Sequence, residues 1–251
     1  MGSHRTWLSK VYILIVYAQA MSAVMDGMNR RGPRSVVDQV ADEVLRRILT
    51  GELAPGSSVA ISTLSEQLEV SHVPVREALR TMEARGLVEF QRGHRPRVSP
   101  VHLEDFEDVF RLRTVLEGEA AGRGIPSADC LPELEEALHS LQSLLIHGET
   151  LAVHAAHTRL HSLMLPAASQ WERRFLSELW FASERYIQLF LESITEQAKV
   201  DVVSESHAAL VRTAKSADPE LVQQAVIEHV EASKAGLAGA VRLASAHREA
   251  G

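Results

Sequence analysis

Hydrophobic residues recur at helical spacing along most of this chain, and breaks in that period mark the ends of the expected elements. The first helix is expected over residues 35–50, and Gly51 follows it as a C-terminal signal. The apolar stripe of this helix consists of Val36, Val40, Val44, Ile48 and Leu49.

Residues 61–90 predict two short helices separated by a tight turn. Thr63 and Glu66 have the spacing of a capping box, so we expect them to open the first helix, which ends near Val70. Ser71 can cap the second helix, and Pro74 lies in its first turn, where a missing N–H costs little. The second helix has an inward apolar stripe of Val75, Leu79 and Met82, which leaves His72, Val73, Arg76 and Arg80 on other faces.

A small hairpin is expected after these helices. Val88 and Phe90 alternate with polar residues, Gly93 provides a turn and Val98 returns. The hairpin has basic residues at Arg92, His94, Arg95 and Arg97, and residues 71–99 contain six arginines and three glutamates. Arg76 and Arg80 could form an ordinary solvated face. A helix-turn-helix followed by a basic wing is, however, typical of DNA recognition.

The same residues resemble a known family. The segments GELAPGSSV and LSEQLEVSHVPVREALRTMEARGLV are similar to the winged-helix signature of the GntR superfamily of bacterial regulators. The resemblance implies DNA contacts from Ser71, His72, Val73 and Arg76, and from Gly93 and His94 at the wing. Members often have arginine where this chain has Ser62 and His72, so bidentate recognition of guanine by arginine is less available here.

Composition and charge fit a globular protein with two unequal parts. The 251 residues are 45% hydrophobic and 24% charged, and the formal net charge is −7. Residues 30–100 carry a net +2, whereas residues 101–251 carry −10, so the acidity lies outside the proposed DNA reader. Cys130 is the single cysteine, which excludes an internal disulfide and suits a cytoplasmic protein.

The first 33 residues fit neither part, and we expect an N-terminal extension there. Arg5 and Lys10 precede the apolar run VYILIVYA, and Ala18-Gln19-Ala20 is reminiscent of a signal-peptide cleavage site. The run is too short to span a bilayer. An upstream start codon, or an arm that packs on a partner subunit, would also explain it.

Ser99-Pro100 marks a boundary between a winged helix over 34–99 and a second domain over 103–246. The apolar period of the second domain is helical throughout, with prolines near the breaks. The pattern therefore predicts an antiparallel helical bundle and a mainly α fold for the whole protein. The expected helices cover 103–122, 131–147, 149–167, 171–195, 201–215 and 219–246.

Two of the twelve histidines have a spacing typical of metal ligands. His157 and His161 stand at i and i+4, so both project from one face of a helix. Such a pair is also common on an ordinary polar face. The segment lacks the glutamate of the H-E-x-x-H metalloprotease motif.

The second half also resembles a family. FRLRTVLEGEAA, GETLAVHAAHTRLHSLMLPAASQ and SHAALVRTAKSADPELVQQAVIEHV are similar to the FCD ligand-binding domain of the FadR subfamily. The resemblance implies a divalent metal, zinc or nickel, with His157 in place of the usual aspartate. It also implies Arg113 as an anion clamp, although Arg113 could instead pair with Glu117 at i,i+4. The implied metal ligands are His157, His161, His207 and His229.

Together these patterns predict a homodimeric regulator that binds palindromic DNA and senses a small carboxylate. A metal sensor of the same fold and a metal-dependent hydrolase with a DNA-binding appendage are the alternatives. His139, His147, His154 and His247 match no role and are expected to be ordinary surface or core histidines.

Overall fold

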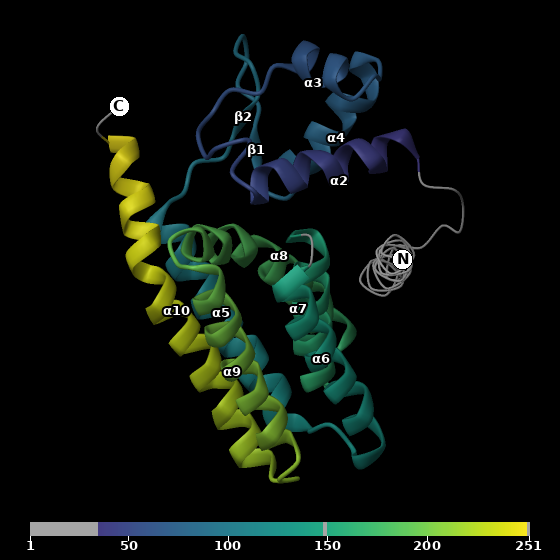
Figure 1. The fold of residues 1–251 in the computed structure, drawn as a ribbon, viewed down its shortest axis with the longest axis vertical. Coiled ribbons are helices and arrows are strands. Elements are labelled where there is room, and N and C mark those ends of the chain that lie inside the picture. The colour runs from purple at the N-terminus through teal and green to yellow at the C-terminus, as the bar shows by residue number, and fades with distance from the viewer. Residues whose placement is uncertain (1–34, 148–149, 250–251) are drawn as a thin grey trace, which may run out of the picture.

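The computed structural model describes residues 35–147 and 150–249, which form a winged helix-turn-helix on one end of a helical bundle (Figure 1). The predicted mainly α fold, with a small β-hairpin wing, is confirmed. The proposed N-terminal extension lies outside the described residues.

Helix α2 spans Val36–Leu49 and begins at a capping box that the sequence analysis did not identify. The Ser35 hydroxyl accepts from the Asp38 amide at 3.1 Å, and the Asp38 carboxylate accepts from the Ser35 amide at 3.1 Å. The predicted apolar stripe is buried except at Val36, which is 51% exposed. Val36 lies in the first turn, beyond the edge of the core. Gly51 follows the helix with φ 71°, as its C-terminal role requires.

Helices α3 and α4 form the predicted helix pair. Helix α3 spans Ile61–Gln67 and its N-cap is Ala60, so the capping box predicted at Thr63 is wrong. The start is set by tertiary pairing, because the Val59 amide donates to the Pro96 carbonyl at 2.7 Å just before it. Helix α4 spans His72–Ala84 and buries the expected stripe of Val75, Leu79 and Met82.

The wing is a short antiparallel pair of strands. Strand β1 covers Val88–Glu89 and β2 covers Arg97–Val98, with Val88 opposite Val98 and Glu89 opposite Arg97. An isolated bridge between Ser58 and Arg97 connects the segment before α3 to strand β2.

The bundle contains the six predicted helices, with limits that differ by a few residues. Helix α9 begins well before the predicted start at residue 201, because Thr195 caps it by accepting from the Ala198 amide at 3.3 Å. The bounds are α5 Leu103–Arg123, α6 Leu131–His147, α7 Thr150–Met164, α8 Gln170–Glu192, α9 Glu196–Ala214 and α10 Pro219–Glu249. A 3₁₀ turn at Ala128–Cys130 precedes α6. In the described part of the chain, no helix is long and apolar enough to cross a membrane.

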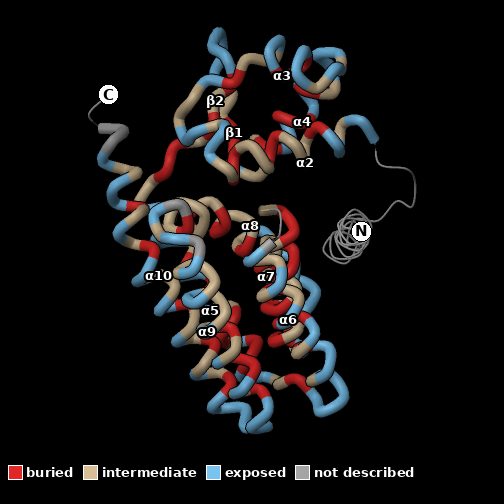
Figure 2. The backbone as a smooth tube through the Cα atoms, in the orientation of Figure 1, coloured by how far each residue is buried: buried red, intermediate tan, exposed pale blue. Residues whose placement is uncertain are grey.

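Buried positions face the spaces between helices, and most exposed positions lie on the outer surfaces and loops (Figure 2). Helix α5 packs along α10, and α6 packs against both α7 and α9. The core of the winged helix is not closed by that domain alone. Leu151 of α7 is buried in it, and Phe181 of α8 packs against it. Two bundle helices are therefore in direct contact with the DNA-binding domain.

Candidate metal centre and DNA-binding face

The residues predicted to contact DNA from helix α4 lie on the exposed surface. Ser71 occupies the N-cap position with an extended backbone, but its side chain makes no capping hydrogen bond. The first amides of α4 therefore lack the expected partner, and the positive end of the helix favours an anion there. His72 and Arg76 are exposed, and Val73 is 65% exposed.

The two arginines of α4 differ in their surroundings. Arg80 donates to the Glu83 carboxylate at 2.6 Å, and its guanidinium lies 3.9 Å from the ring centroid of Phe90. Arg76 has no ion pair with any residue that the structure describes. Arg76 is therefore the better candidate for a DNA contact, and a contact from Arg80 stays a prediction.

The wing presents the remaining predicted contacts to solvent. Gly93 has φ 79°, which a residue with a side chain rarely adopts, and the His94 amide closes the turn by donating to Gln91 at 3.0 Å. His94 and Arg95 are exposed, as is Gly93. The wing tip extends away from the bundle (Figure 1), so the bundle does not cover it.

The four histidines predicted to bind a metal come together inside the bundle. Helix α7 contributes His157 and His161, α9 contributes His207, and α10 contributes His229. The ring centroid of His157 lies 4.6 Å from that of His161 and 4.8 Å from that of His207. The ring of His229 lies 4.7 Å from that of His207 and 5.1 Å from that of His161. Three nitrogen atoms, one each from His157, His161 and His207, lie within 4.8 Å of one another.

Hydrogen bonds orient two of these rings. The Nδ1 atom of His207 lies 2.7 Å from the Val203 carbonyl, so Nδ1 carries the proton and Nε2 has a free lone pair. The Nδ1 atom of His161 lies 2.9 Å from the Glu117 carboxylate, so this ring also directs Nδ1 to an acceptor and leaves Nε2 for another partner. The Nε2 atoms of both histidines are buried, and neither has a hydrogen-bond partner among the described residues.

Burial favours the neutral form of three of these four imidazoles, those of His157, His207 and His229. Removal from water, together with the neighbouring His161, lowers the pKa of His207 to about 3. Burial, together with the neighbouring imidazoles, also holds the pKa values of His157 and His229 well below their ordinary value. Neutral imidazole is the form that binds metal.

A buried polar network lies beside the cluster and contains Arg113. Its Nε donates to Glu117 at 2.8 Å and its Nη1 donates to the Ser183 hydroxyl at 3.2 Å. Trp180 donates to the same carboxylate at 3.0 Å. The predicted alternative, an i,i+4 pair between Arg113 and Glu117, is thus confirmed. The role of Arg113 as an anion clamp stays a prediction.

Comparison with known proteins identifies the family. A model of the bacterial regulatory proteins of the gntR family matches residues 36–98, and a model of the FCD domain matches residues 108–232. The HTH-type transcriptional regulator BphR of Paraburkholderia xenovorans is 31% identical over 209 residues, covering 80% of this chain and 84% of that protein. The chain belongs to the GntR family.

Other GntR relatives extend the match. A "probable D-xylose utilization operon transcriptional repressor" of Paenarthrobacter nicotinovorans is 30% identical over 212 residues, which cover 83% of this chain and 92% of that protein. Escherichia coli McbR/YncC has the same fold, with a TM-score of 0.66 at 22% identity over 82% of this chain and 98% of that one. The structure of a putative GntR transcriptional regulator from Rhodococcus sp. RHA1 matches with a TM-score of 0.67 at 19% identity. The match covers 82% of this chain and 99% of that one.

This GntR protein is therefore a DNA-binding transcriptional regulator with an FCD domain, and not the metal-dependent hydrolase that the histidines left open. Its placement in the FadR subfamily stays a prediction.

Sequence reasoning missed several residues of the network. It identified Glu117 only as a partner of Arg113, although this carboxylate also binds His161 and Trp180. His154, expected to have no role, has its Nδ1 2.8 Å from the buried carboxylate of Glu184. His139 is exposed, as expected for a surface histidine. Among these contacts, only the pair of Arg113 and Glu117 could be predicted from sequence spacing, because it lies within one helix. The other hydrogen bonds of the network join different helices.

Proposed function

We propose that this regulator holds one divalent metal ion, zinc or nickel, at its four histidines and changes its operator affinity when a small organic acid binds there. The observation that carries the proposal is the convergence of four imidazoles, two of which have buried Nε2 atoms with no hydrogen-bond partner in the described part of the chain. A buried acceptor left unsatisfied costs roughly 1–3 kcal/mol, which coordination of an ion would remove.

The residues present fit such an ion. His157, His161, His207 and His229 would hold it, and imidazole at the position of His157, where the family pattern has an aspartate, is also a good ligand for zinc or nickel. The Glu117 carboxylate and the Val203 carbonyl orient two of the rings, which is the usual support for ligating histidines. A bound divalent cation would supply a Lewis-acid centre to which a carboxylate can coordinate.

The charge balance of the site favours an anionic effector. Four neutral imidazoles leave the +2 charge of an ion intact. The nearest carboxylate, Glu117, is already paired with Arg113 at 2.8 Å. The cluster would therefore keep a net positive charge that a small carboxylate can neutralise, and Arg113 can hold a second oxygen of that ligand.

Two helices provide a route from the cluster to the DNA-binding domain. Helix α7 carries His157 and His161, and its Leu151 is buried in the winged-helix core. Helix α8 carries Ser183, which binds Arg113, and Phe181, whose ring lies 4.5 Å from the guanidinium of Arg85. A ligand that shifts either helix would change how the winged helix is held. A coupling of about 1–3 kcal/mol would change operator affinity roughly 5–150-fold.

The proposal includes a cytoplasmic homodimer on palindromic DNA. One recognition helix reads only a few base pairs, and two helices related by a two-fold axis give a helix-turn-helix protein its usual specificity.

Metal analysis of the purified protein tests the proposal that the four histidines hold a metal ion. Wild type should contain about one zinc or nickel ion per chain, because one histidine cluster can hold one ion. His207→Ala should lose stoichiometric metal, whereas His139→Ala, which removes an exposed histidine, should keep it. His157→Asp should also retain the ion. Stoichiometric metal in the His161/His207/His229 triple alanine variant would contradict the site.

A thermal-shift screen of carboxylates on metal-loaded and metal-free protein tests the second part. A ligand at 100 times its Kd stabilises by about 2.7 kcal/mol, so a genuine effector should raise the midpoint of the loaded protein only. If the metal alone changes operator affinity and no carboxylate adds to it, the protein is a metal sensor.

A further inference from the structure

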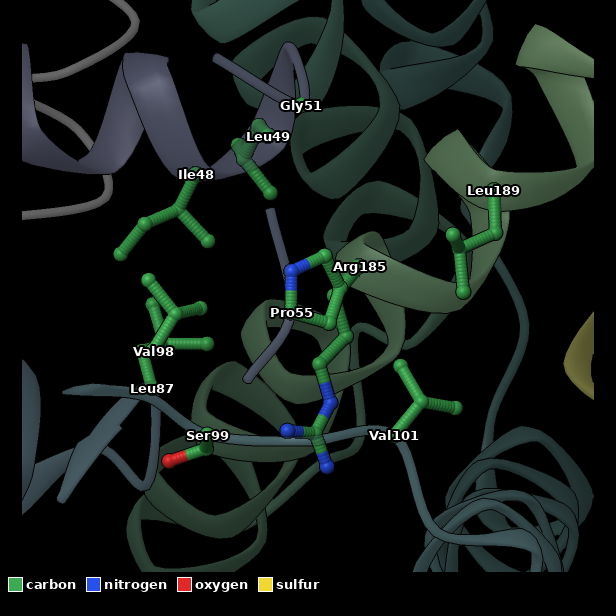
Figure 3. Close-up of a pocket in the computed structure, with 10 residues that line it drawn as sticks. All are labelled: Ile48, Leu49, Gly51, Pro55, Leu87, Val98, Ser99, Val101, Arg185 and Leu189. Carbon is green, nitrogen blue, oxygen red and sulfur yellow. The ribbon is translucent and has the colours of Figure 1, made fainter. Parts of the chain in front are cut away.

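A pocket lies at the junction between the winged helix and the bundle (Figure 3). Its volume is about 40 Å³, and none of the four clustered histidines lines it. The end of α2, the segment that follows it and the root of the wing supply one side, and α8 supplies Arg185 and Leu189. Most of the lining is apolar, with Leu49, Val98 and Val101 among the contributors.

Arg185 is the one charged side chain in this lining, and its pairing is incomplete. The side chain is only 15% exposed, and Nη2 donates to the Tyr186 hydroxyl at 2.6 Å. The nearest carboxylate, Asp105, lies 3.8 Å away and has a side chain that is 59% exposed. The Nε atom of Arg185 is buried and has no acceptor among the described residues. A charged N–H group in that position is costly unless something accepts its hydrogen bond.

We propose that this pocket binds a small monocarboxylate of about the size of acetate, with its carboxylate on the Arg185 Nε–H. A water molecule needs roughly 10–15 Å³ by the same measure of volume, so the pocket has room for about three waters or one such anion. The charged hydrogen bond would complete the pairing of Arg185, and the methyl group would contact Val101 and Leu189.

An anion bound in this pocket would contact both domains. Its walls come from both domains, so an anion on Arg185 would bridge α8 and the winged helix. The inference is independent of the metal site, because the Arg185 pocket and the histidine cluster share no residue.

Thermal unfolding of the full-length protein at constant ionic strength tests the site, with sodium acetate, sodium chloride and sodium isethionate as probes. The protein is first stripped of metal with phenanthroline and dialysed, so that acetate cannot act through a metal ion. Acetate should raise the unfolding midpoint by several degrees, whereas the bulkier isethionate should not. An equal response to chloride would overturn the assignment to a carboxylate.

Two pocket variants and one control complete the test. Arg185→Met removes the cation. Leu189→Phe keeps Arg185 but fills the pocket with a larger side chain. Both variants should therefore lose the acetate response. Arg174→Met removes an exposed arginine of the same helix and should respond as wild type does. An acetate response that survives in both pocket variants, or no response in wild type because the pocket holds only ordered water, would refute the proposal.

Discussion

Replacing Glu117 with glutamine should destabilise the protein far more than a surface substitution of the same kind. The carboxylate is 1% exposed and accepts from Arg113 at 2.8 Å, His161 at 2.9 Å and Trp180 at 3.0 Å. Burial by itself would raise the pKa of Glu117, but the charge of Arg113 and the hydrogen bonds from Arg113 and His161 outweigh it and hold the pKa far below its usual range. The glutamine has the same shape without the charge, so Arg113 would be left as a buried cation.

Removing one partner of a buried ion pair costs about 3–5 kcal/mol, out of a typical total of about 5–15 kcal/mol. For a domain of about 150–250 residues, each kcal/mol lowers the melting temperature by roughly 2–4 °C, so Glu117→Gln should melt about 6–20 °C below wild type. Urea denaturation and calorimetry of metal-free protein measure this loss.

Glu135→Gln is the matched control. The Glu135 side chain is 43% exposed and pairs with Lys215 on the surface, so its loss should cost less than about 1 kcal/mol. Adding Arg113→Met to Glu117→Gln should recover part of the stability, because the uncompensated cation is gone. Equal destabilisation by Glu117→Gln and Glu135→Gln would refute the reasoning.

Three further predictions concern DNA, assembly and pH. If a dimer neutralises about six phosphates, a plot of the logarithm of the DNA-binding constant against the logarithm of the salt concentration should have a slope near −5. Arg76→Ala should make this slope shallower, whereas Arg174→Ala should not. An unchanged slope in Arg76→Ala would show that α4 does not contact the DNA. Light scattering should find a dimer, and a monomer with full affinity for one operator would count against it. Metal-free protein should lose stability as pH falls from about 6.5 towards 3, because the unfolded chain binds protons that the folded His207 does not. For His207 the loss reaches at most about 5 kcal/mol, and urea midpoints that do not change between about pH 7 and 5 would contradict it.

The sequence by itself determined the elements and the location of the chemistry. The apolar stripe of α4 defined its buried face because a helix repeats every 3.6 residues, so the exposure of His72 and Arg76 followed directly. The spacing of His157 and His161 placed both on one face of α7 for the same reason. Family resemblance then supplied His207 and His229, which no local period could connect to α7.

Only the tertiary structure decided how these parts meet. Helix α3 starts at Ile61 because the preceding residues pair with the wing, and a local capping pattern could not reveal that. Glu117 joins His161 and Trp180 across separations of 44 and 63 residues, and Arg185 lines a pocket formed partly by another domain. Such contacts depend on which helices pack together and at what register, whereas a hydrophobic period specifies only which face of each helix is buried.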